Sequence, residues 1–105
     1  MNESKKVTYK SFQEFWPFYL SQHQNPLNRK LHVAGTLIGL TVGFILIFKK
    51  QFLVGILCGL TLGYGFAWTG HFVFEKNRPA TFKYPFYSLR GDFKLLISTL
   101  FKKDL

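Results

Sequence analysis

The sequence contains a single cysteine and only five acidic residues among its 105 positions. Cys58 has no partner for a disulfide framework or a cysteine metal cluster, and we expect it to serve packing. A glycine-rich phosphate-binding loop is also absent, and no motif supports a Ser-His-Asp catalytic arrangement. These absences exclude disulfide-stabilised scaffolds, cysteine-bound metals and phosphate-loop sites as explanations of what the chain does.

Two long uncharged segments occupy the middle of the chain, at residues 33–48 and 52–74. With its flanks, each segment is long enough to cross the ~30 Å hydrocarbon core of a bilayer as a helix. Only residues 49–51 separate them, so the two helices are expected to run antiparallel as neighbours. A chain of 105 residues retains too little material to bury both helices in a soluble bundle. The sequence therefore predicts a transmembrane hairpin with spans at 31–48 and 52–74.

An amphipathic segment lies on each side of this hairpin. Residues 8–23 carry aromatic side chains at the i, i+3, i+4 and i+7 spacing of one helical face: Phe12, Phe15, Trp16 and Tyr19. Residues 86–102 have an apolar face that lies opposite lysines. We expect both segments to be interfacial helices at the headgroup boundary. The predicted fold class is an all-α membrane protein, a two-span transmembrane helical hairpin flanked by N- and C-terminal interfacial amphipathic helices, in one membrane domain over residues 1–105.

Basic residues outnumber acidic residues by 14 to five, which gives a formal net charge of +9. Only Lys49 and Lys50 lie in the hairpin loop, whereas all the others flank the outer ends of the two spans. The positive-inside rule then predicts that both termini are cytoplasmic. The same basic face should attract anionic membrane lipid. Nucleic acid is not an expected partner, because the charges follow the membrane borders rather than forming a stripe.

The compactness of the chain points to a bacterial inner membrane. Its polar first ten residues indicate no cleavable signal peptide. In a eukaryotic cell, the C-terminal Lys102-Lys103-Asp104-Leu105 fits a cytosolic dilysine retrieval signal, which makes the endoplasmic reticulum membrane the alternative location.

Glycines recur at every fourth position on both spans: Gly35, Gly39 and Gly43 on the first, and Gly55, Gly59 and Gly63 on the second. Helices in lipid associate through close backbone contact, which small residues at this spacing allow. The two stripes predict a tightly closed hairpin, and a homodimer through the same stripes is the alternative use.

Three histidines gather at the cytoplasmic border of the predicted hairpin. On antiparallel helices His32 and His71 lie at similar depth, and His23 continues the aromatic face of the first segment. Glu75 follows His71 by four residues, on the same helix face. Two histidines and one carboxylate that leave coordination positions open favour non-haem Fe(II) and oxygen chemistry. A haem held by two histidines and histidines that are merely interfacial are the alternatives at this point.

Four segments of the sequence resemble the domain-of-unknown-function-962 family: FWPFYLSQH at 15–23, HQNPLNRKLHVAG at 23–35, GHFVFEKNRPA at 70–80 and YPFYSLRGDF at 84–93. The resemblance runs in order over nearly the whole chain. The best-known member of that family is the yeast endoplasmic-reticulum 2-hydroxy-palmitic acid dioxygenase. It uses Fe(II) and O2 to shorten 2-hydroxy fatty acids by one carbon, a step of fatty-acid alpha-oxidation.

The resemblance implies a dioxygenase activity of this kind here, with a long-chain 2-hydroxy fatty acid and O2 as substrates. It implies Fe(II) ligands at four positions: His23, His32, His71 and Glu75. Catalytic roles are expected for Asn77, Arg78 and Asp92, and Arg29 or Arg78 would bind the substrate carboxylate. Two other functions stay open at this point: a non-catalytic lipid-binding or membrane-organising hairpin, and a haem-binding membrane protein.

Overall fold

A computed structural model describes residues 8–102. Residues 103–105 of the retrieval-type signal and the basic residues Lys5 and Lys6 lie outside the described residues. Between residues 8 and 102 the ordered elements are all helical and no strand is present, which confirms the all-α class. The elements are α1 (Phe12–Ser21), α2 (Pro26–Phe48), α3 (Phe52–Thr69), the π-helical turn η2 (Gly70–Glu75), the short 3-10 helix η3 (Ala80–Phe82) and α4 (Pro85–Phe101).

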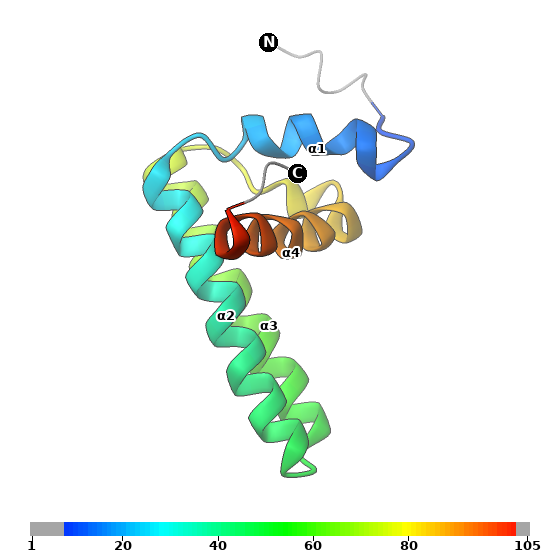
Figure 1. The fold of residues 1–105 in the computed structure, drawn as a ribbon, viewed down its shortest axis with the longest axis vertical. Coiled ribbons are helices and arrows are strands. Elements are labelled where there is room, and N and C mark those ends of the chain that lie inside the picture. The colour runs from blue at the N-terminus through cyan, green and yellow to red at the C-terminus, as the bar shows by residue number, and fades with distance from the viewer. Residues whose placement is uncertain (1–7, 103–105) are drawn as a thin grey trace.

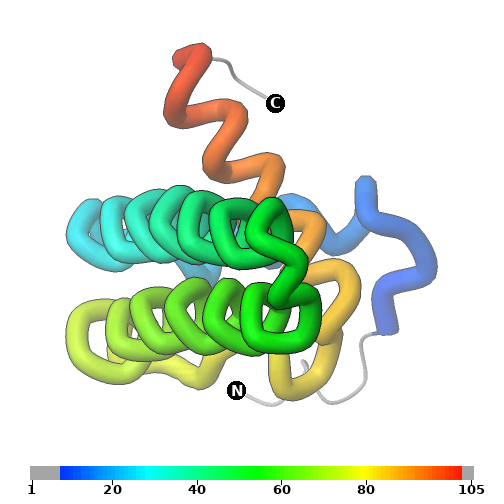
Figure 2. The backbone as a smooth tube through the Cα atoms, turned by 90° about the horizontal axis from the view of Figure 1, so that it is seen from below, coloured from blue at the N-terminus to red at the C-terminus, as the bar shows by residue number. Residues whose placement is uncertain are grey.

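Helices α2 and α3 form an antiparallel hairpin (Figure 1) and lie side by side in the view from below (Figure 2). Their backbones approach closely because glycine faces glycine. A Cβ added to Gly39 would lie 2.6 Å from the carbonyl oxygen of Gly59, and one added to Gly55 would lie 2.9 Å from that of Gly43. By length and composition, α2 and the continuous segment of α3 and η2 (Phe52–Glu75) could each cross a membrane. The glycine stripes therefore contact each other within one chain, as expected for a closed hairpin.

Helix α2 begins earlier than the sequence pattern predicts, at Pro26 rather than at residue 31. Proline at the first helical position sacrifices no hydrogen bond. The side chain of Asn25 accepts from the amide of Leu27 at 2.8 Å, which caps the helix. The longer helix carries both Asn28 and His32 on one rigid element.

The second span changes form before it ends. Helix α3 stops at Thr69, and η2 continues it as a π-helical turn to Glu75, after which Lys76 adopts a left-handed conformation with φ of 60°. Short π turns of this kind recur at functional sites. Pro79 then prevents any continuation of the helix.

Helices α1 and α4 lie across the end of the hairpin that is remote from its loop (Figure 1). The aromatic face of α1 is buried in the main apolar cluster of the protein together with Ala80 and Leu95: Phe12, Phe15, Trp16 and Tyr19. Aromatic rings bury more area than other side chains, so they provide much of the core of a small protein. This face is therefore a packing surface, whereas we expected it to contact lipid headgroups.

Candidate metal centre

The three histidines of the chain meet where α1, α2 and η2 converge. His23 lies in the turn after α1, His32 lies in α2, and His71 lies in η2. All three residues are almost fully buried, with 1%, 3% and 2% of their surface exposed. Each offers one ring nitrogen to a group in which these atoms all lie within 4.8 Å of one another. The structure thus brings together three of the four metal ligands that the sequence analysis expects.

The outer nitrogen of each of the first two rings donates to a backbone oxygen. His23 Nδ1 lies 2.7 Å from the carbonyl oxygen of Tyr19, and His32 Nδ1 lies 3.0 Å from that of Asn28. A carbonyl oxygen only accepts, so the proton of each neutral ring is on Nδ1. The lone pair of Nε2 is then free to face the other rings.

His71 is held in the same tautomer by a side chain. Its Nδ1 lies 2.7 Å from Oδ1 of Asn77, which accepts the ring proton. The amide nitrogen of Asn77 donates to the carbonyl oxygen of Gln22 at 3.2 Å, and this contact determines which way the amide group points. Asn77 is therefore a positioning residue for the third histidine.

Two of the inward lone pairs are very close. His23 Nε2 and His32 Nε2 are 3.0 Å apart, and neither carries a proton when Nδ1 is the donor. Lone pairs at this separation repel, and a bound cation that both nitrogens coordinate would relieve this repulsion. Imidazole nitrogens that bind one ion at about 2.1 Å are separated by roughly 3–3.5 Å, which is close to the spacing observed.

The donor set could hold a transition-metal ion. Zinc, iron, copper and nickel all accept neutral imidazole ligands, and three protein ligands leave coordination positions open. A haem does not fit, because the ring centroids of His23 and His32 are 4.3 Å apart and leave no room for a porphyrin between two axial ligands. The geometry therefore argues against the haem-binding alternative.

Asp92 lies at the edge of the cluster. Its Oδ1 accepts from the hydroxyl of Tyr19 at 2.7 Å and is 4.0 Å from His32 Nε2. Burial raises the pKa of Asp92 from 3.8 to about 7, although the Tyr19 hydrogen bond opposes the rise.

Burial, and then the neighbouring His32 ring, lowers the pKa of His23 from 6.5 to about 2. A neutral His23 offers its lone pair to a metal without first losing a proton.

Glu75, the fourth expected ligand, lies outside this group. Its Oε1 accepts from the backbone amide of Asn25 and from Asn28 Nδ2, both at 2.9 Å. Its Oε2 accepts from the backbone amide of Gln24 at 3.0 Å. Three donors already hold the carboxylate, so it ties η2 to the start of α2. Spacing along η2 does not reveal this, because the donors come from another segment of the chain.

The two arginines expected at the substrate carboxylate have different surroundings. Arg29 Nε donates to the carbonyl oxygen of His23 and so supports the turn that carries this histidine. The guanidinium of Arg78 lies over the ring of Phe82, 5.7 Å from its centroid. Arg29 is therefore attached to a residue of the cluster, whereas Arg78 packs against η3.

Tyr19 and Asn28 are supporting residues that the sequence analysis does not identify. Each lies four residues before a histidine and accepts from the Nδ1 of that histidine. Asn28 is also fully buried, and its side chain holds Glu75. The four-residue spacing between each of these residues and its histidine can be read from the sequence. Only the structure shows that the two imidazole rings are buried and bond to these carbonyl oxygens rather than to water.

Replacing Gly70 by alanine should damage the cluster indirectly. A Cβ at this position would clash with Oδ1 of Asn28. Moving this fully buried side chain would break the hydrogen bond from its Nδ2 to Glu75. We expect a loss of about 1–3 kcal/mol in unfolding free energy and a fall of about 10-fold in metal affinity. Thermal unfolding and metal titration measure the two effects.

Gly65→Ala is the matched control for that substitution. A Cβ at Gly65 meets no atom within 4 Å, so stability and metal affinity should stay at the wild-type values. Equal effects of the two substitutions would show that Gly70 is important only as a helix residue and not for its contact with Asn28.

Comparison with known proteins gives one match. A family model described as "2-hydroxy-palmitic acid dioxygenase Mpo1-like" matches residues 9–104. This range includes all three histidines and Asp92. The search of curated proteins and the search of solved structures found no match.

Proposed function

Because the chain belongs to the Mpo1-like family, we propose that it is an Fe(II)-dependent membrane dioxygenase that shortens 2-hydroxy fatty acids by one carbon. The observation that supports this proposal is the set of three buried histidines whose Nδ1 atoms all donate outward. His23, His32 and His71 would hold the iron. When bound, the iron would supply open coordination positions and the redox chemistry that O2 requires.

The proposed reaction converts R–CH(OH)–COOH and O2 into R–COOH, CO2 and water. The bond between the carboxyl carbon and C2 breaks, and C2 becomes the carboxyl carbon of the shorter acid. The electrons that leave these two carbons reduce O2 completely, so no further reductant is needed. The family description supports the substrate class, and the three-histidine group supports a metal site.

We assign to Asp92 the role of general base, which takes the proton of the substrate's 2-hydroxyl group. Its carboxylate lies 4.0 Å from His32 Nε2, so a substrate beside the histidines presents its 2-hydroxyl group to Asp92. Tyr19 holds the carboxylate in place through its hydroxyl, and a positioned carboxylate of this kind can accept a proton from the substrate. We assign the substrate carboxylate to Arg29, because this arginine already contacts the backbone of His23.

We also propose that the hairpin spans a membrane with the histidines at its cytoplasmic side. Large apolar side chains remain exposed along α2 and α3: Phe44, Phe48, Phe52, Leu53, Ile56 and Leu57. A soluble protein rarely leaves so extended an apolar surface uncovered. Helix α4 also exposes Ile97, Leu100 and Phe101, which suits a helix at the headgroup boundary.

Anaerobic loading with Fe(II), followed by 2-hydroxypalmitic acid and O2, tests the proposed reaction. We expect the one-carbon-shorter acid, detected by mass spectrometry, with a turnover number of about 1 per second or higher. The zinc-loaded protein is the control, because zinc binds the same ligands and has no redox chemistry. Iron binding without product, for several chain lengths, would favour the non-catalytic lipid-binding hairpin.

A further inference from the structure

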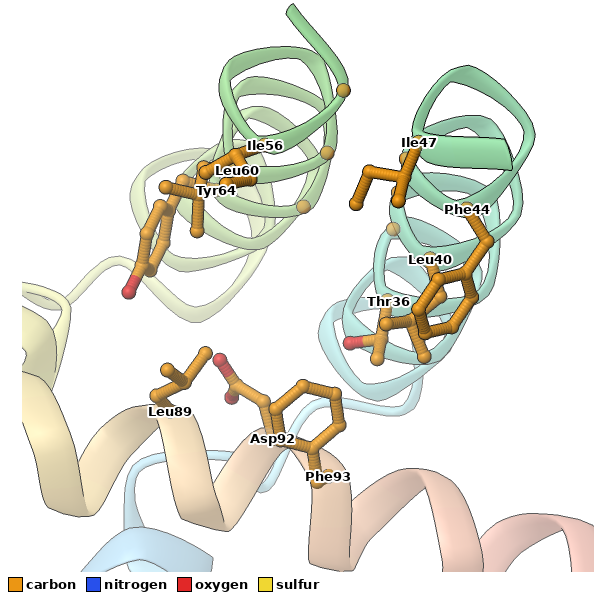
Figure 3. Close-up of a pocket in the computed structure, with 16 residues that line it drawn as sticks. Thr36, Leu40, Phe44, Ile47, Ile56, Leu60, Tyr64, Leu89, Asp92 and Phe93 are labelled. Atoms are coloured by element: carbon orange, nitrogen blue, oxygen red, sulfur yellow. The ribbon is translucent and has the colours of Figure 1, made fainter. Parts of the chain in front are cut away.

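An apolar groove runs along the hairpin on the side that α4 crosses (Figure 3). The two glycine stripes line it along the contact between the two backbones, and larger side chains stand only on either side of that contact. Leu40 and Phe44 of α2 border it on one side, and Ile56 and Leu60 of α3 border it on the other. The groove is thus an apolar surface channel that follows the contact between the two helices.

At one end the groove reaches Asp92, which lies beside the histidine cluster. Asp92 lines it, and Figure 3 shows the carboxylate directed from α4 toward the gap between the two helices. The same carboxylate lies 4.0 Å from His32 Nε2. Thr36, which also lines the groove, is one helical turn from His32 and donates to its carbonyl oxygen at 2.9 Å. The polar end of the groove and the candidate metal centre are therefore adjacent.

The length of the groove matches one leaflet of a bilayer. Its lining on α2 extends from Gly35 to Ile47, a helical rise of roughly 18 Å. This is about half of the ~30 Å hydrocarbon core. Ile47 and Ile56 lie on opposite sides of the gap between the two helices, away from Asp92 (Figure 3).

We propose that this groove binds the acyl chain of a 2-hydroxy fatty acid, with its methyl end between Ile47 and Ile56, so that these residues determine the accepted chain length. The inference rests on the proposed function and adds where the substrate lies. A free fatty acid is the occupant, not a phospholipid tail, because the histidines are almost fully buried and only a compact head reaches them. The hydroxyl and carboxylate of the acid provide such a head.

Ile56→Trp tests the chain-length assignment. The indole should fill the remote end of the groove, so turnover of the longest substrates should fall at least about 10-fold relative to short ones. Leu57→Trp is the matched control, because Leu57 is the next residue, is similarly exposed (54% against 50%) and does not line the groove. Its chain-length profile should equal that of the wild type.

Photo-crosslinking of the metal-free wild-type protein tests the same site without activity. A 2-hydroxypalmitic acid with a diazirine near its methyl end should label the segments around Ile47 and Ile56, as located by peptide mass spectrometry. This measurement also covers the case in which the tryptophan variants fail to fold.

The outcomes separate this inference from the proposed function. Labelling of the remote end together with a shortened profile in Ile56→Trp supports the groove. Labelling of that end without turnover in the wild type leaves the groove in place and contradicts the dioxygenase. Turnover with labelling elsewhere, or with equal profiles in the two tryptophan variants, contradicts the groove alone.

Discussion

If the proposed function is right, replacing His32 by alanine is expected to abolish both Fe(II) binding and the proposed shortening of 2-hydroxy fatty acids. The Nε2 atom of His32 is 3.0 Å from that of His23 and 4.0 Å from Asp92 Oδ1, so its removal opens the cluster. The affinity should fall by more than the roughly 10- to 100-fold loss that follows removal of a residue that only supports a ligand. Anaerobic Fe(II) titration measures this. Fe(II) is expected to raise the Tm of the wild type, and His32→Ala should lack this rise.

Glu75→Gln is the control for this prediction. The carboxylate of Glu75 is held by donors from Gln24, Asn25 and Asn28, so its loss should cost about 1–3 kcal/mol of stability. The variant should nevertheless still bind Fe(II). If Glu75→Gln lost iron as completely as His32→Ala, Glu75 would be a fourth ligand and our assignment of its role would be wrong.

Replacing Asp92 by asparagine is expected to lower kcat about 100- to 10,000-fold, the usual contribution of a general base, while Fe(II) remains bound. Asparagine has the same shape and its amide oxygen still accepts from Tyr19, but it takes no proton from the substrate. Turnover normalised to iron content measures the effect.

Tyr19→Phe should show a smaller effect of the same kind as Asp92→Asn. It keeps the ring that stacks on His23, with centroids 3.9 Å apart, and removes only the hydroxyl that positions Asp92. A hydrogen bond to a charged group contributes about 1.5–3 kcal/mol, so kcat should fall roughly 10- to 100-fold. Complete loss of iron in Asp92→Asn would identify Asp92 as a ligand, and unchanged kcat would remove it from the chemistry.

The hairpin and its packing were predictable because their causes are local in the sequence. The apolar composition of a long uncharged segment is sufficient to predict a helix in an apolar environment. The spacing of four between glycines places them on one helix face, and Gly39 and Gly59 do meet across the hairpin. The meeting of His32 and His71 follows from the same antiparallel geometry, since each lies a similar number of residues from the loop.

The surroundings of the histidines were not predictable in the same way. The aromatic face of α1 has the same periodicity whether it contacts lipid or protein, and only the packing of α4 shows that it is buried. Gly91 permits this packing, because a Cβ there would lie 2.7 Å from the ring of Tyr19. The adjacent Asp92 is thereby brought to the Tyr19 hydroxyl and to the cluster.

By itself, the sequence determined the all-helical class, the closed hairpin and the convergence of three histidines, because charge, periodicity and spacing act along a single segment. Only the tertiary structure decided that the Glu75 carboxylate accepts hydrogen bonds from the start of α2. It also placed Asp92 beside the histidines, at the end of an apolar groove. These assignments depend on donors and acceptors from segments that are distant in sequence. A side chain of given type satisfies whichever partner the fold brings to it, and sequence spacing does not specify that partner.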